Sequence, residues 1–258
     1  MNRRVRRLMV VVTAWAVSTI GGMAPAAAQV QQVIYIIDKP TAGILNDGAY
    51  LLRARLGPES SFLASIRIGF RERFQIGTSF GMQRIFERGD PEFNNQVGFQ
   101  VRLRLLDELE APALAVGFDS QGLGEYHAAD DLERYDRKSP GFYVVLSKNY
   151  ALVAGELSAH GGVSWSTERE DDGDPNVFAG ADWLLFEHLS FLLDVDAALN
   201  DDTDNPDFGR GGIYIDAGIR WFYGESLVMT LIFRDLSGNF GRSRSVGREF
   251  ELALIDFF

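Results

Sequence analysis

Residues 96–106 read QVGFQVRLRLL, and apolar and polar side chains alternate along the whole stretch. Successive side chains of an extended strand point to opposite faces, so the pattern predicts a β-strand with two unlike faces. The apolar face comprises Val97, Phe99, Val101, Leu103 and Leu105, and the opposite face carries Arg102 and Arg104. A charged side chain that faces lipid near the bilayer midplane costs about 2–4 kcal/mol. In a membrane barrel the arginine face would therefore point into the lumen.

The same pattern recurs in further segments separated by turn-rich stretches. The segments span residues 50–56, 62–70, 75–83, 96–106, 113–120, 141–148, 152–166, 176–186, 189–200, 212–223, 227–236 and 248–258. The connections that follow the second, fourth, sixth, eighth and tenth segments are short. Those that follow the third, fifth, seventh, ninth and eleventh segments are long and polar. This asymmetry is typical of outer-membrane barrels. The sequence therefore predicts an all-β fold, a transmembrane antiparallel up-and-down β-barrel of about 12 strands over residues 47–258.

Residues 1–28 have the pattern of a cleaved signal peptide, with a head of four arginines, the apolar run LMVVVTAWAV and small residues before Gln29. An N-terminal membrane anchor is the alternative, but the run is short, and Gly21, Gly22 and Pro25 follow it. Cleavage would remove four arginines and no acid, so the net charge would fall from −11 to −15. Such acidity argues against nucleic acid as a partner.

The chain has no cysteine, and no later segment is apolar for the length of a membrane-spanning helix. A closed barrel is then the remaining structure that can cross a membrane. We expect export to the outer membrane of a Gram-negative bacterium, with lipid and lipopolysaccharide around the barrel. Folding should require the barrel assembly machinery.

Aromatic residues concentrate near the short connections, as expected for a girdle at the boundary between lipid and water. They are Phe70, Phe74, Tyr150, Phe186, Trp221, Phe222, Tyr223, Phe257 and Phe258. The last nine residues, FELALIDFF, also resemble the C-terminal assembly signal of such barrels, although Asp256 interrupts the apolar face. Residues 29–46 precede the barrel, and a periplasmic β-segment, a partial plug and an extra strand all fit them.

Charged residues on the inward face are unevenly distributed. The early strands contribute Arg53, Arg55, Arg67, Arg102 and Arg104, and the later ones Glu156, Asp182, Asp194, Asp196 and Asp216, with Arg220 and Arg234 as exceptions. Opposed basic and acidic walls can select a polar solute. Alternatively, the two sets pair across a narrow lumen and fill it. The first functional hypothesis is accordingly a narrow pore or an accessory for export of a polar solute.

A hydrolase is a weaker hypothesis, centred on His160, and we expect no enzymatic activity. His160 shares a strand face with Glu156, Ser158 and Ser164. Residues two apart on a strand are separated by roughly 7 Å, so one strand cannot bring a nucleophile to its base. A hydrogen-bonded polar residue of the lumen is the simpler interpretation of His160.

Two long loops are dense in carboxylates, which are the ligands that Ca²⁺ prefers. They contain Asp171, Asp172, Asp174, Asp201, Asp202, Asp204 and Asp207. A structural or adhesive barrel with a plugged lumen and cation-binding loops is therefore a further hypothesis, and solvated loops that bind nothing are the simpler alternative. The EF-hand spacing and nucleotide-binding fingerprints are absent, so no other cofactor is expected.

Residues 112–150 contain PALAVGFDSQGLG and then GFYVVLSKNY, which resemble YjbH-like outer-membrane proteins. The residues that carry the resemblance are Val116, Gly117, Asp119, Gly122, Gly124, Tyr143, Val145, Ser147 and Lys148. The resemblance implies a small member of that group and a role in making or exporting exopolysaccharide.

Overall fold

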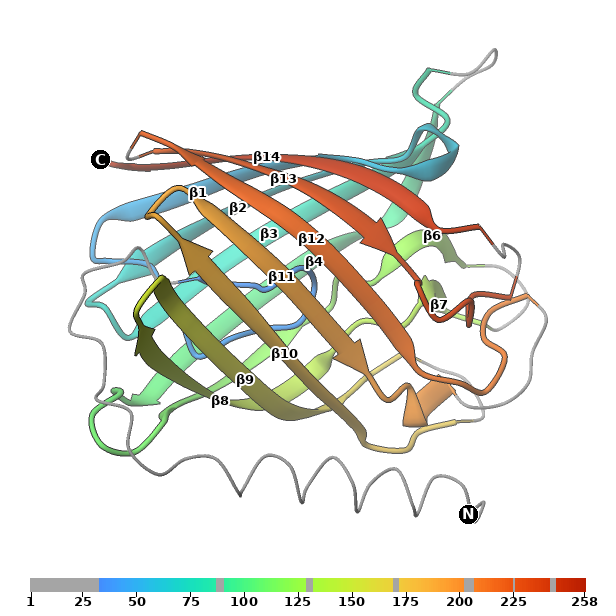
Figure 1. Cartoon of the computed structure of the whole chain (residues 1–258). Coiled ribbons are helices and arrows are strands. Elements are labelled where there is room, and N and C mark those ends of the chain that lie inside the picture. Colours follow the sequence, from blue (N-terminus) through green and yellow to red (C-terminus); the bar gives the residue numbers. More distant parts are fainter. Residues whose placement is uncertain are drawn as a thin grey trace.

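The computed structural model describes residues 33–86, 91–128, 132–168, 172–201, 207–224, 226–241 and 245–258, so the predicted signal peptide lies outside the described residues. A closed antiparallel barrel dominates the fold (Figure 1). Its strands are β1 (Ala49–Leu56), β2 (Phe62–Phe70), β3 (Phe74–Gln83), β4 (Glu92–Leu106), β5 (Ala113–Asp119), β8 (Gly141–Leu152), β9 (Gly155–Trp165), β10 (Asn176–Leu185), β11 (Leu189–Asp196), β12 (Tyr214–Tyr223), β13 (Leu227–Arg234) and β14 (Gly247–Phe257). Two 3-10 turns, η1 (Pro58–Ser60) and η2 (Leu199–Asp201), lie in connections.

The predicted twelve-stranded barrel is confirmed, with small differences at strand ends. Tyr150, expected in a turn, lies within β8. The barrel closes where β1 pairs with β14, for example at Ala49 opposite Phe257. The amide of Phe258 continues this ladder by donating to the carbonyl of Gly48 at 3.1 Å. The terminal phenylalanines therefore belong to the wall of the barrel.

The outward and inward faces differ as the alternation predicts. On β4, Phe99 is 52% exposed, whereas Arg102 is 1% exposed. On β11, Leu193 is 44% exposed and its neighbour Asp194 is 1% exposed. The outer surface is therefore apolar and the lumen is polar. Within the described ranges, no helix is long and apolar enough to cross a membrane.

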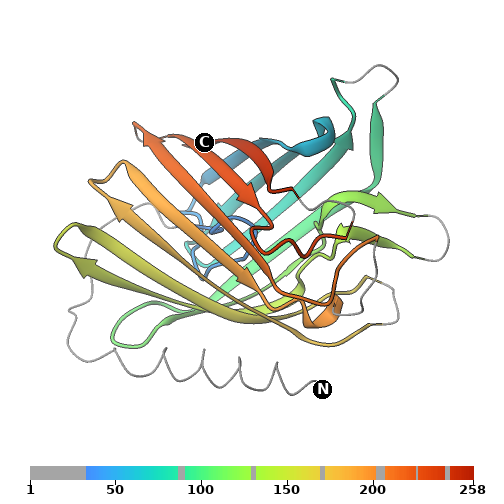
Figure 2. The same cartoon turned by 45° about the vertical axis from the view of Figure 1, so that its right-hand side comes forward.

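A small hairpin of β6 (Leu123–His127) and β7 (Arg134–Arg137) forms a separate two-stranded sheet at the long-loop end (Figures 1 and 2). The sequence analysis treats this region as an irregular polar loop, which is wrong. The two strands are short. Buried and exposed side chains do not alternate along β7, because Arg134, Tyr135 and Arg137 are all buried. The hairpin depends on contacts with the lumen rather than on a local pattern.

Residues 33–46, here called the inner segment, lie within the ring of strands (Figures 1 and 2). The segment bends back at an isolated bridge between Tyr35 and Pro40 and pairs with none of the described barrel strands. Its apolar side chains are buried in three clusters with residues of the wall, of which one contains Ile36, Ile37, Leu192 and Ile232. The segment therefore occupies the lumen as a folded insert.

Gly180 of β10 allows the inner segment to approach the wall closely. A Cβ atom at this position would lie 2.4 Å from Cδ1 of Ile36 and 2.6 Å from the carbonyl oxygen of Leu193. Real Cβ atoms do not approach other atoms so closely. The absence of a side chain at Gly180 is thus a condition for the observed position of the segment.

Candidate functional site

Four buried arginines bind main-chain carbonyl oxygens of the inner segment, and one of them, Arg55, donates from Nη2 to the carbonyl oxygen of Ile37 at 3.1 Å. Nη1 of Arg102 donates to the carbonyl oxygens of Ile34 at 2.8 Å and Gly43 at 2.7 Å. Arg104 donates from Nε and Nη2 to that of Ala42 at 3.0 and 2.8 Å. Arg220 donates from Nη2 to the carbonyls of Ile36 at 2.6 Å and Tyr35 at 3.2 Å. Because the inner segment pairs with none of the described barrel strands, its carbonyl oxygens need other hydrogen-bond donors, and these guanidinium groups supply them.

Two other residues of the wall, Asp194 on β11 and Ser147 on β8, bind main-chain N–H groups of the inner segment. Oδ2 of Asp194 accepts hydrogen bonds from three consecutive amides, those of Ile37 at 3.2 Å, Asp38 at 2.8 Å and Lys39 at 3.1 Å. Oγ of Ser147 accepts from the amide of Ala42 at 2.7 Å. Consecutive amides that converge on one anion form a binding concavity for negative charge. The wall thus supplies acceptors for the N–H groups of the segment and donors for its carbonyl oxygens.

Other predicted lumen residues pair with each other. Arg55 contacts Glu251 at 2.7 Å and Asp38 at 2.7 Å, and Arg53 shares Glu251. Asp216 accepts from Arg137 at 2.7 Å and from Arg234 at 3.3 Å, while Asp196 binds Lys39 and Arg137. Some charges therefore pair with other residues of the wall, and others pair with Asp38 and Lys39 of the inner segment, an arrangement that the sequence analysis does not consider. A role of these residues in selectivity stays a prediction.

His160 lies in a chain of hydrogen bonds that crosses three neighbouring strands. Its Nδ1 is 2.8 Å from Oγ of Ser147 on β8, and its Nε2 is 3.0 Å from Oδ1 of Asp182 on β10. All three side chains are buried. The partners of His160 come from the two neighbouring strands and not from Ser158 or Ser164 of its own strand, in line with the spacing along a single strand. The pairing of β8 with β9 sets Ser147 directly opposite His160, so strand register was the missed signal.

The β6–β7 hairpin is fixed to the rim of the lumen by charged groups that the sequence analysis missed. Arg134 donates from Nη1 and Nη2 to the two carboxylate oxygens of Asp201, each at 3.0 Å. Glu168 accepts from the amides of Tyr135 at 2.9 Å and Ser139 at 2.7 Å. Burial raises the pKa of Glu168, although these N–H groups act in the opposite direction. The hairpin thus closes over the long-loop end of the lumen.

The predicted calcium ligands are not gathered in the described part of the chain. Asp171, Asp202 and Asp204 lie outside the described residues. Asp201 forms the ion pair with Arg134, and Oδ1 of Asp172 accepts from the amide of Asp174 at 3.2 Å. Among the described residues, no group of three or more His, Cys, Asp or Glu side chains could hold a metal ion. The calcium site stays a prediction.

The motif residues of 112–150 mostly serve contacts with the inner segment and within the wall. The hydroxyl of Tyr35 donates to Asp119 at 2.8 Å, and a Cβ at Gly117 would lie 2.3 Å from the hydroxyl of Tyr143. Gly122 and Gly124 belong to the hairpin region, where they lie close to side chains of β7. Nζ of Lys148 donates to the carbonyl of Leu109 at 2.6 Å. Such requirements arise in any barrel with a filled lumen and do not identify a family.

No protein-family model matches the chain, and no curated protein matches it either. Solved structures with a similar fold include the NanC porin in a rhombohedral crystal form, with 10% identity, a TM-score of 0.49 and coverage of 81% of this chain and 99% of that chain. The KdgM porin gives 9% identity, a TM-score of 0.48 and the same coverage. The KdgM porin in complex with disordered oligogalacturonate gives 9% identity and a TM-score of 0.46. At these identities the likeness concerns the fold alone.

The resemblance to YjbH-like proteins is therefore wrong, because the comparisons point to porin barrels and none of them identifies a YjbH-like protein. The exopolysaccharide role that it implied loses its support. What the chain and its structure establish together is a closed twelve-stranded barrel, porin-like in fold, whose lumen holds its own N-terminal segment.

Proposed function

We propose that this protein is an outer-membrane channel for a polar solute, and that the inner segment closes it. The observation that carries the proposal is the attachment of the segment. Arg102, Arg104 and Arg220 donate hydrogen bonds to its backbone carbonyls, Asp194 accepts from its backbone amides, and three apolar clusters bury its side chains. The segment is not a strand of the wall, so it can leave without breaking the barrel.

Withdrawal of the segment would leave a lumen lined by charged and hydroxyl groups. Arg102 on β4, Arg220 on β12, Asp194 on β11 and Ser147 on β8 would lose main-chain partners and regain them from water or from a solute. A barrel of about twelve strands is wider than the eight that side chains alone just fill. Such a passage suits a polar solute, because an apolar one would leave these groups without hydrogen bonds.

The test of the channel is the current through planar bilayers containing purified residues 29–258. We expect brief openings from a mostly closed baseline, because the described structure has a filled lumen. Solute uptake into vesicles should follow the openings and should be greater for polar than for apolar compounds of equal size. A protein that never conducts, even when the inner segment is removed, would instead be a structural barrel with a permanent plug.

The apolar outer surface supports the location in a membrane. Exposed aromatic rings occur at the short-turn end, including Phe186, Trp221, Tyr223 and Phe258, where a girdle at the lipid boundary would lie. Lipid and lipopolysaccharide would contact this surface, and the barrel assembly machinery would insert the strands.

Substitution of Leu193 by Arg tests the membrane location. Leu193 lies halfway along β11 and is 44% exposed on the outer face. We expect Leu193→Arg to lower the free energy of unfolding in phospholipid vesicles by about 2–4 kcal/mol, because the charge would face acyl chains. Urea titration of vesicle-embedded protein measures the effect, with Leu193→Met as the matched control. Equal stability of both variants would contradict a membrane-spanning wall at this residue.

The chain Ser147–His160–Asp182 favours a second candidate, a lumenal hydrolase. With the proton on Nε2, His160 donates to Asp182, and its Nδ1 can accept the proton of the Ser147 hydroxyl. Ser147 would then attack an ester or amide carbonyl. In the described structure the amide of Ala42 donates a hydrogen bond to the hydroxyl oxygen of Ser147, so this activity would require withdrawal of the inner segment.

The hydrolase candidate predicts that a fluorophosphonate labels Ser147 once residues 33–45 are deleted. Labelling should disappear in Ser147→Ala and fall by about 100-fold or more in His160→Ala, because the base activates the nucleophile. Ser158→Ala is the control, since Ser158 is also buried on β9 but does not contact His160. The absence of labelling in the deleted barrel would exclude this candidate and leave the channel unaffected.

A further inference from the structure

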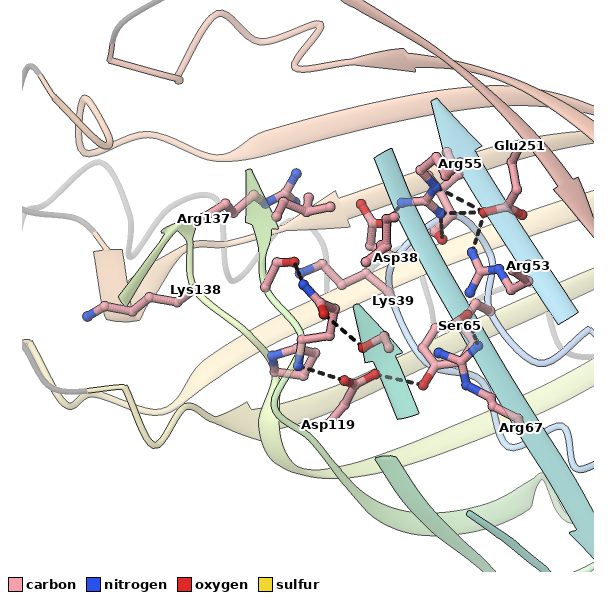
Figure 3. A pocket seen from close by; sticks show the side chains of 18 residues that line it. Asp38, Lys39, Arg53, Arg55, Ser65, Arg67, Asp119, Arg137, Lys138 and Glu251 are labelled. Carbon is pink, nitrogen blue, oxygen red and sulfur yellow. Dashed lines mark hydrogen bonds and ion pairs between the residues drawn. The ribbon is translucent and has the colours of Figure 1, made fainter. Parts of the chain in front are cut away.

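A cavity of about 50 Å³ lies beside the inner segment, between the wall and the β6–β7 hairpin. Figure 3 shows Arg53 and Arg67 on one side of it and Arg137 and Lys138 on the other. Its lining contains more basic than acidic residues; the basic ones are Lys39, Arg53, Arg55, Arg67, Arg137 and Lys138, and the acidic ones Asp38, Asp119 and Glu251. At roughly 10–15 Å³ for each water, the cavity has room for a few waters or one small polar group.

Arg67 differs from most of these basic residues in its partners. It is 4% exposed, and its Nη1 donates to Oγ of Ser65 at 3.2 Å. Its Nε has no hydrogen-bond partner, and within the described ranges no carboxylate forms an ion pair with it. Buried guanidinium groups ordinarily have an acidic partner. Arg67 is therefore a cation positioned for a ligand that the chain does not supply.

The ring of Tyr35 holds further positive charge next to Arg67. The guanidinium carbons of Arg67, Arg102 and Arg53 lie 4.5, 4.8 and 5.4 Å from the ring centroid, and cation–π attraction offsets part of their mutual repulsion. The nearby carboxylates are Asp119, which accepts from the Tyr35 hydroxyl, and Glu251, which Arg53 shares with Arg55. An excess of positive charge therefore remains beside the cavity.

We propose that this cavity is a binding site for an oxyanion, a carboxylate or phosphate group, which pairs with the guanidinium group of Arg67. Planar guanidinium donors match these two anions in geometry and charge. Arg53 adds positive charge, and the hydroxyls of Ser65 and Ser79 complete a polar lining. The inference deepens the proposed function, on which it rests for the access of solutes to the lumen, by naming the chemical class that the lumen binds.

Calorimetric titration of residues 29–258 in detergent tests the site, with inorganic phosphate, glucuronate and neutral glucose as probes. We expect at least one anion to bind and glucose not to bind. Arg67→Gln should weaken anion binding about tenfold or more, because a charge-assisted hydrogen bond is lost. Binding of phosphate alone would identify a free inorganic anion, and binding of glucuronate alone the carboxylate of a sugar acid.

The matched control is Arg73→Gln, in which an arginine about half exposed in the turn after β2 is neutralised and affinity should not change. Thermal unfolding without anion should be unchanged or higher for Arg67→Gln, while the anion-dependent rise should be lost. If Arg67→Gln does not fold, Arg67→Lys is used in its place, because it keeps the positive charge but not the planar guanidinium group. Weaker anion binding is expected for this variant too. Equal affinity of wild type and variant, or no anion binding by wild type, overturns the site. Because the titration uses the closed barrel, a failure to bind leaves the channel proposal standing, and a silent bilayer recording leaves the site standing.

Discussion

Deletion of residues 33–45 should change a mostly closed barrel into one that conducts steadily. The deletion removes all the main-chain groups that Arg102, Arg104, Arg220 and Asp194 bind, together with the buried apolar side chains of the segment. It retains Asn46, whose carbonyl accepts from the amide of Ala49 at 3.1 Å in the turn before β1. Each 1.4 kcal/mol lost from the free energy that favours the closed state shifts the equilibrium between closed and open barrels about tenfold. The mean current should therefore rise by about tenfold or more.

Planar-bilayer recording measures this change, and gel mobility before and after boiling establishes that the deleted barrel is folded. A synthetic peptide with the sequence VIYIIDKPTAGIL should reduce the current again when added from the short-turn side. A folded but silent barrel would show that the lumen is closed by something other than this segment. The plugged structural barrel would then be the better description.

Substitution of Asp194 by Ala should loosen the segment while leaving it in the chain. Three amides of the inner segment converge on Oδ2 of Asp194, and the carboxylate is 1% exposed. Each buried N–H without an acceptor costs about 1–3 kcal/mol, so closure should weaken by about 3 kcal/mol or more. The open fraction should therefore rise about 100-fold.

Hydrogen exchange at the amides of residues 37–39 reports this effect directly, and the frequency of openings reports it functionally. Asp174→Ala is the control, because Asp174 is exposed in the connection before β10. Asp194→Asn should be intermediate, since one carbonyl oxygen remains to accept. Unchanged exchange in Asp194→Ala would show that the apolar clusters alone hold the segment.

The barrel wall could be predicted from the sequence because each strand carries its own local pattern. The period-two alternation on β4 and β11 follows from one lipid-facing and one lumen-facing side, and it fixes register as well as existence. Predicted and observed ends differ mainly where this constraint stops. β4 begins at Glu92, four residues before the predicted start, in a stretch whose side chains are polar on both faces around Phe93.

The contents of the lumen could not be predicted in the same way, because they depend on contacts between residues far apart in the sequence. The hydrogen bond from Arg102 to Ile34 spans 68 residues, and that from Ile37 to Asp194 spans 157. Arg102, Arg220 and Asp194 bind main-chain atoms, which leave no trace in residue types. The contact of His160 with Ser147 could have been predicted, because antiparallel pairing of the two predicted strands places Ser147 opposite His160.

The grip on main-chain atoms has a consequence for how sequence can vary inside the barrel. Every residue except proline offers the same N–H and C=O groups, so Arg102, Arg220 and Asp194 do not distinguish one residue type from another at positions 34, 36 and 37. Insertion of a single residue, by contrast, would turn carbonyls towards the carboxylate and amides towards the guanidinium groups. The main-chain hydrogen bonds therefore fix the length and direction of the enclosed chain, whereas the apolar clusters around Ile34, Ile36 and Ile37 fix which side chains it can carry.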